Sequence, residues 1–171
     1  MGGGMELYIM RHAIAALRET WEGPDADRPL TGRGRARMRQ NARGLRRLRV
    51  KFDVIVSSPL VRALQTAEVV AGELGYRSPV EICPALAPGL RPEAVFQFLA
   101  SYPDAERLLL VGHEPDLGNL ALTLIGGAQA DCFPMKKGGV CRIDLDGMPP
   151  NGPGDLVWAL TPGILRALVR R

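Results

Sequence analysis

The chain of 171 residues contains two histidines, and each follows a short apolar run typical of a buried strand. His12 follows Arg11 after the first run, residues 7–10, and His113 follows Gly112 after another run, residues 108–111. Arg62 lies close behind a third run. A neutral imidazole can attack phosphorus, a second can donate to the phosphoryl group, and guanidinium groups offer forked donors that suit phosphate oxygens. These residue types indicate a phosphoryl-binding site with a nucleophile and no metal.

Strand and helix patterns alternate along the sequence, which is typical of an α/β domain with a mainly parallel sheet. Strands are predicted over residues 5–10, 53–57, 80–83, 107–111, 140–145 and 156–160. Helices are predicted over residues 31–49, 58–75, 92–102 and 115–125. Gly126-Gly127 ends the last of them, and a short helical turn is predicted over residues 13–17. We expect one domain over residues 5–171, a flexible leader over 1–4, and a different direction for the last two strands.

The carboxyl ends of parallel strands meet at one edge of a sheet, and ligands bind there in open α/β folds. We therefore expect Arg11, Arg62 and both histidines to open onto one crevice. Ser58, the predicted N-cap of one helix, and Pro115 at the start of another would add free N–H groups that favour an anion. Each of these residues taken alone is more often structural. Their joint placement at strand exits is what favours a phosphate site.

The segment from Arg28 to Lys51 contains ten basic residues and no acidic ones, in a chain with a net charge of +4. Such a cluster raises nucleic-acid binding as a hypothesis. Thr31 is typical of an N-cap, however, and Met38, Ala42 and Leu45 recur at helical spacing. The arginines then fall on solvated faces of one helix, with no aromatic side chains between them to stack on bases. We expect no nucleic-acid partner, although this face could dock an acidic one.

The composition, 46% apolar and 23% charged, is that of a globular chain and argues against extensive disorder. The apolar runs are shorter than the roughly 18 residues that a membrane span needs, and the N-terminus lacks the pattern of a secretory signal. Cys83, Cys132 and Cys141 have no metal-ligand spacing and fit buried thiols in a reducing compartment. A cytoplasmic protein without membrane partner, metal or cofactor is expected.

Four segments, in this order, resemble the motifs of the histidine phosphatase (phosphoglycerate mutase-like) superfamily. They are Leu7-Tyr8-Ile9-Met10-Arg11-His12-Ala13, Arg28-Pro29-Leu30-Thr31, Ser58-Pro59-Leu60-Val61-Arg62-Ala63-Leu64-Gln65-Thr66-Ala67 and Val111-Gly112-His113-Glu114-Pro115. The small size of the chain and its R-P-L-T segment most resemble the SixA-type protein-histidine phosphatases. The resemblance implies a three-layer α/β sandwich with helices on both faces of a mainly parallel sheet.

The resemblance also implies a role for each candidate residue. His12 would be the nucleophile that becomes transiently phosphorylated, and we expect its other ring nitrogen to donate to a backbone carbonyl. Arg11, Arg62 and His113 would bind the phosphoryl oxygens and stabilise the transition state. Arg28 would line the mouth of the site. Water would then attack phospho-His12 and release inorganic phosphate, without a metal.

The sequence departs from the family pattern at two positions. Ala13 replaces the usual glycine after Arg-His, so that its methyl group crowds the backbone unless φ is negative there. Ala85 stands where SixA relatives often carry a glutamate, which leaves Glu81 and Glu114 as alternative acids. Expelling an alkoxide needs an acid that contributes roughly 10² to 10⁴ in rate, whereas the imidazole of a phosphoramidate leaves readily once protonated.

The missing acid therefore favours phosphohistidine on a protein as the substrate, for instance on a histidine-containing phosphotransfer domain. Two alternatives stay open. One is a small-molecule phosphomonoesterase of the same superfamily. The other is a catalytically silent module that binds phosphoproteins, which Ala13 leaves possible. The sequence also leaves open whether the loop over residues 13–27 closes over the pocket.

Overall fold

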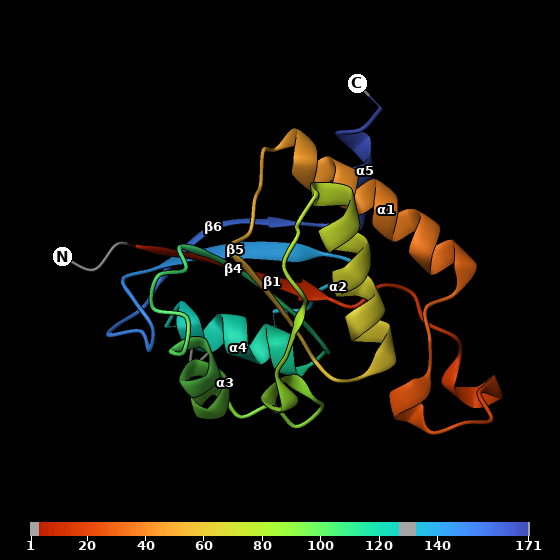
Figure 1. The fold of residues 1–171 in the computed structure, drawn as a ribbon, viewed down its shortest axis with the longest axis horizontal. Helices are drawn as coiled ribbons and strands as arrows, with labels where there is room; N and C mark the ends of the chain where they lie inside the picture. The colour runs from red at the N-terminus through yellow and green to blue at the C-terminus, as the bar shows by residue number, and fades with distance from the viewer. Residues whose placement is uncertain (1–3, 127–132, 171) are drawn as a thin grey trace.

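The computed structural model describes residues 4–126 and 133–170 (Figure 1). Residues 1–3 of the expected leader, Gly127 and Cys132 lie outside the described residues. The strands are β1 (Met5–Arg11), β2 (Val54–Ser57), β3 (Glu81–Ile82), β4 (Arg107–Gly112), β5 (Val140–Leu145) and β6 (Asp155–Leu160). The α-helices are α1 (Gly32–Arg47), α2 (Val61–Leu74), α3 (Pro92–Leu99), α4 (Asp116–Leu124) and α5 (Pro162–Ala167). The 3-10 helices are η1 (Arg18–Thr20), η2 (Asp25–Asp27) and η3 (Pro84–Leu86).

The strands form a six-stranded sheet in the order β3-β2-β4-β1-β5-β6. The pairs β1–β4, β2–β4 and β2–β3 are parallel, because helices return the chain to the same edge between these strands. Strand β5 is antiparallel to both β1 and β6. The prediction of a mainly parallel sheet is confirmed. The prediction of a different direction for the last two strands is right for β5 and wrong for β6, because β6 is antiparallel to β5 and therefore runs in the same direction as β1.

Helices cover both faces of the sheet, so the predicted three-layer sandwich is also confirmed. In Figure 1, α1 and α5 lie above the sheet, and α3 and α4 lie below it, while α2 packs against α1 and shares its core. Alternate residues of β1 serve the two sides: Leu7 and Ile9 belong to the core beneath the sheet, and Tyr8 and Met10 to the core above it. Because β1 is covered on both faces, its apolar run is nearly continuous.

Helix α1 begins as its sequence predicts. The side chain of Thr31 accepts a hydrogen bond from the N–H of Gly34 at 2.9 Å and caps the helix, while Met38 and Leu45 are fully buried. Gly34 is required by packing, since a Cβ there would lie 2.0 Å from the carbonyl oxygen of Ile14. This contact holds the start of α1 against the segment that leaves His12.

Several local predictions are wrong. Helix α2 begins at Val61 with Leu60 at its N-cap, so Ser58 is not the cap that we predicted. Residues 13–17 form no helical turn; Ala15 instead makes an isolated bridge to Leu30. Strand β3 and helix α3 are shorter than predicted, and α5 was not predicted. Strand β3 is at the edge of the sheet and α5 is near the C-terminal end, whereas Ser58 and Ala15 are buried. In both settings tertiary contacts outweigh local propensity.

Every helix in the described part of the chain falls short of the length and apolar character that crossing a membrane requires.

Candidate active site

The four residues predicted to meet do so in one pocket. Arg11, His12, Arg62 and His113 line a cavity of about 380 Å³, and the two imidazole rings lie 5.3 Å apart between centroids. The other lining residues are Arg18, Asp25, Arg28, Pro88, Glu114 and Lys137. Residues from distant parts of the chain therefore form one strongly cationic site.

The parallel pairing of the central strands explains why these residues meet. Arg11 lies opposite Gly112 in the β1–β4 register, and the N–H of His12 donates to the carbonyl oxygen of Gly112 at 3.0 Å. The N–H of Ser58 donates to the carbonyl oxygen of Val111 at 2.9 Å. Backbone bonds thus hold the exits of β1, β2 and β4 side by side at the carboxyl edge of the sheet.

His12 is held as a neutral imidazole with a defined tautomer. Its Nδ1 lies 2.7 Å from the carbonyl oxygen of Ala13, which can only accept, so Nδ1 carries the proton and Nε2 keeps its lone pair. Burial, together with the charges of His113 and the two site arginines, lowers the pKa of His12 to about 3, although the hydrogen bond to Ala13 opposes the change. The prediction that this ring donates to a backbone carbonyl is confirmed.

Ala13 fits the position that glycine usually occupies in the motif. Arg49 is the one non-glycine residue with positive φ among residues 4–126 and 133–170, so Ala13 needs no special backbone freedom. Its N–H donates to the hydroxyl of Thr66 at 3.0 Å, and its methyl group is buried in the core above the sheet. The substitution distorts neither the strand exit nor the neighbouring His12.

The two arginines present donors that the protein itself leaves unused. Arg11 Nη1 donates to the carbonyl oxygen of Met135 at 2.8 Å, and both η nitrogens of Arg62 donate to Asp25. The Nε atoms of both arginines are buried and have no hydrogen-bond partner among the described residues. An unsatisfied buried donor costs about 1–3 kcal/mol. A bound anion would remove this cost, as expected of a preorganised phosphoryl site.

His113 is paired with Ser58, a site residue that the sequence reasoning assigned to a helix cap. His113 Nε2 lies 2.8 Å from the Ser58 hydroxyl oxygen, and both side chains are buried. Nδ1 is buried and has no hydrogen-bond partner within residues 4–126 and 133–170. Burial and the charge of Arg62 lower the pKa of His113 to about 4, so the ring is neutral near pH 7. The position of Ser58 at a strand exit was the available signal for a site role.

Arg28 lines the pocket, as predicted, through contacts with the loop over residues 13–27. Its Nε donates to Asp25 Oδ1 at 3.0 Å, and its Nη1 donates to the carbonyl oxygen of Ala16 at 2.7 Å. The same loop contributes Arg18 and Asp25 to the pocket. Asp25 is a second site residue that the sequence reasoning missed, because its turn context favoured a structural assignment.

Only one of the two alternative acids lines the pocket. Glu114 does so, and its Oε1 atom is buried with no hydrogen-bond partner in the part of the chain that the structure describes. Burial raises the pKa of Glu114, whereas Arg11 and the backbone N–H groups of Met135 and Gly118 oppose the rise. Glu81 is not a lining residue of this pocket. Of the two, Glu114 is therefore the candidate for the acid that Ala85 does not provide.

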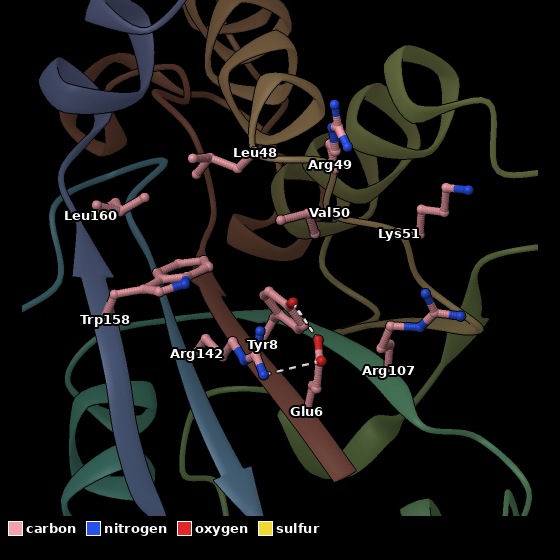
Figure 2. A pocket seen from close by; sticks show the side chains of 10 residues that line it. All are labelled: Glu6, Tyr8, Leu48, Arg49, Val50, Lys51, Arg107, Arg142, Trp158 and Leu160. Atoms are coloured by element: carbon pink, nitrogen blue, oxygen red, sulfur yellow. Dashed lines mark hydrogen bonds and ion pairs between the residues drawn. The ribbon is translucent and has the colours of Figure 1, made fainter.

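A second hollow, of about 390 Å³, lies on the α1 side of the sheet (Figure 2). It contains neither histidine, and its central polar groups satisfy one another. Tyr8 donates to Glu6 at 2.6 Å, and Arg142 pairs with Glu6 at 3.0 Å and with Asp144 at 2.7 Å. We therefore assign the phosphoryl chemistry to the cavity between the two imidazoles.

Comparisons with known proteins agree with this site. The family model of the histidine phosphatase superfamily (branch 1) matches residues 7–87. The chain is similar to an uncharacterised protein of Picosynechococcus, with 42% identity over 81% of this chain and 84% of that protein. It is 30% identical to the phosphohistidine phosphatase SixA of Escherichia coli over 92% of this chain and 94% of SixA.

The solved structures give the same result. The structure of the protein histidine phosphatase SixA complexed with tungstate matches with a TM-score of 0.82 and 29% identity, covering 94% of this chain and 99% of that one. The similarity thus extends across the fold, including the strand exits that form the pocket.

Proposed function

The chain belongs to the histidine phosphatase superfamily, and on that premise we propose that this phosphatase removes the phosphoryl group from phosphohistidine on a protein. The observation that carries the proposal is the state in which His12 is held. It is a buried, neutral imidazole whose Nδ1 is occupied by a carbonyl oxygen, beside two guanidiniums with unused donors. We assign the activity to a single domain over residues 5–171.

In the first step, the Nε2 lone pair of His12 attacks phosphorus. A P–N bond forms to His12 while the P–N bond to the substrate imidazole breaks. The substrate ring is protonated on its other nitrogen, so the bonding electron pair stays on the departing nitrogen and neutral imidazole leaves. In the second step, water attacks phospho-His12, its proton is lost to solvent, and inorganic phosphate leaves. His12 returns to its starting state with Nδ1 still bonded to the Ala13 carbonyl.

Arg11 and Arg62 have the task of neutralising the charge on the equatorial oxygens during both steps, and the neutral ring of His113 has the task of donating a hydrogen bond to them. The unused Nε donors of the arginines suit that task because they are fixed before the substrate arrives. Losing one such group should cost roughly 10² to 10³ in kcat. The reaction proposed here assigns no step to a metal.

The choice of a protein phosphohistidine rests on two arguments. The position after β3 that SixA relatives often fill with an acid is Ala85 here, and a phosphoramidate depends least on such an acid. The similarity to SixA covers nearly the whole of both chains and supports the same substrate class. A histidine-containing phosphotransfer domain in the cytoplasm is the partner that we propose.

A phosphate monoester is a second candidate substrate, favoured by one observation. Glu114 lines the pocket, and burial raises its pKa, which favours the protonated carboxyl that an alkoxide leaving group needs. A small-molecule phosphomonoesterase would need that proton at the leaving oxygen. The two candidates therefore differ in their dependence on Glu114.

The test compares hydrolysis of a phosphohistidine peptide with hydrolysis of p-nitrophenyl phosphate and sugar phosphates, for the wild type and His12→Ala. We expect the phosphopeptide to be preferred, the variant to be inactive, and an acid-labile, base-stable phosphate to be trapped on His12. Preference for the esters would favour the second candidate. Tight binding of the phosphopeptide without turnover would favour a silent binding module, and undiminished activity in the variant would remove His12 from the mechanism.

A further inference from the structure

We infer that Asp25 is a positioning residue for phosphoryl transfer, which holds Arg62 so that one edge of its guanidinium stays free for the phosphoryl group. The inference rests on the proposed function, because that function assigns Arg62 to the phosphoryl oxygens. Asp25 lies in η2, more than thirty residues before Arg62 in the chain, and belongs to none of the motifs that the sequence reasoning used.

The contacts define which edge of Arg62 is occupied. Nη1 donates to the backbone oxygen of Asp25 at 2.8 Å, and Nη2 donates to its Oδ2 at 3.0 Å. Asp25 thus takes the edge formed by the two η nitrogens. The donors left over are Nε–H and the second N–H of Nη2, which form a fork that fits two oxygens of one phosphoryl group. Nε is the buried atom that lacks a partner.

Asp25 is itself fixed from the other side. Its Oδ1 accepts from Arg28 Nε at 3.0 Å and lies 4.0 Å from Arg18 Nε. Although burial opposes it, the charges of Arg62 and Arg28 lower the pKa of Asp25, so the carboxylate stays ionised near neutral pH. Arg28 also donates to the carbonyl oxygen of Ala16, which ties this cluster to the loop.

The place of Arg62 in its helix explains why it needs such a partner. Arg62 is the second residue of α2, and a cation in the first turn of a helix is opposed by the helix dipole. Its side chain is only 6% exposed, so water cannot compensate for its charge. With no acidic residue in the first turn of α2, the Asp25 carboxylate supplies the missing anion from another element.

A positioning residue should affect the transition state more than the bound substrate. If the fork of Arg62 shifts by about 1 Å, the rate can fall by about 10²-fold. We expect Asp25→Ala to lower kcat by about 10- to 100-fold and to change KM by less than about threefold. Asp25→Asn keeps an oxygen for Nη2 and should recover part of that loss. Asp27→Ala is the matched control, because Asp27 is exposed in the same 3-10 helix.

The experiment measures kcat and KM for the wild type and the three variants on whichever substrate the wild type hydrolyses. It also measures inhibition by vanadate, which mimics the five-coordinate transition state, and by inorganic phosphate. We expect vanadate inhibition of Asp25→Ala to weaken at least fivefold more than phosphate inhibition, with Asp27→Ala unchanged. Equal weakening of both inhibitors, a kcat within twofold of the wild type, or an equal loss in Asp27→Ala would overturn the inference.

Folding and function are separated within the same experiment. Melting temperatures identify a variant that has lost its structure, and Asp25→Asn then carries the test because it preserves the contact with Arg62. A wild type that hydrolyses only phosphate esters would refute the phosphohistidine substrate and leave the role of Asp25 to be judged on those esters. A wild type that hydrolyses nothing would refute the proposed function, and the dissociation constants of vanadate and phosphate, measured by calorimetry on the same variants, would then decide the role of Asp25.

Discussion

The two neutral histidines should make the stability of this protein fall steeply in mild acid. His12 and His113 are 7% and 4% exposed, and burial holds their pKa values at about 3 and about 4 in the folded protein. In the unfolded chain both rings take up a proton near pH 6.5. Between these values the unfolded state binds more protons, so the free energy of unfolding decreases as the pH falls.

The magnitude follows from those pKa values. Below pH 6.5, each histidine costs up to about 1.4 kcal/mol per pH unit until its folded pKa is reached. Between pH 6.5 and pH 4.5 this amounts to about 2 kcal/mol for each ring, or about 4 kcal/mol for the pair. That is a large part of the 5–15 kcal/mol that typically stabilises a domain. Below about pH 4 the contribution of His113 stops growing, because its ring takes up a proton in the folded state as well, and that of His12 stops below about pH 3.

Urea unfolding followed by circular dichroism from pH 7.5 to pH 4.5 would measure this dependence. The comparison is with the double variant His12→Asn, His113→Asn, which has no imidazole left to titrate. We expect the two stability curves to converge as the pH falls, with the variant losing about 4 kcal/mol less than the wild type. Each single variant should recover about half of that difference. Parallel curves for the wild type and the double variant would show that the burial argument is wrong.

Three further outcomes follow from the contacts. Arg62→Lys keeps the charge but loses the fork, so kcat should fall by roughly 10² with little change in melting temperature; an activity within twofold of the wild type would contradict the assigned geometry. Glu114→Gln should leave hydrolysis of a phosphohistidine peptide within about threefold of the wild type, and a selective loss on p-nitrophenyl phosphate, measured side by side, would support the ester alternative. Gly34→Ala places a methyl group 2.0 Å from the Ile14 carbonyl and should cost about 1–3 kcal/mol in urea unfolding, whereas Gly32→Ala, which has open space, should not.

The larger features of the fold were predictable because they depend on local patterns. A run such as β1 is apolar throughout because it is buried on both faces, and the spacing of Met38, Ala42 and Leu45 matches a helix with one buried side. The order of strands and helices then required a mainly parallel sheet. From that sheet it followed that both histidines would meet at one edge.

The features that the patterns missed are either too short to show a period or depend on contacts between residues distant in the chain. Helix α5 carries its own signal, since Thr161 caps it by accepting from the N–H of Ile164, yet six residues give too short a period to recognise. Ser58 was assigned to a cap because serine before proline favours one. Its hydroxyl is instead beside His113, a partner 55 residues away.

The sequence by itself determined which residues are present at the strand exits and that they can transfer a phosphoryl group. Only the tertiary structure decided the state in which they are held. Burial keeps both imidazoles neutral, the Ala13 carbonyl selects the tautomer of His12, and Asp25 leaves one edge of Arg62 open. Protonation and side-chain orientation depend on the solvent exclusion and the neighbours of each group, which residues distant in the chain provide only once the chain has folded.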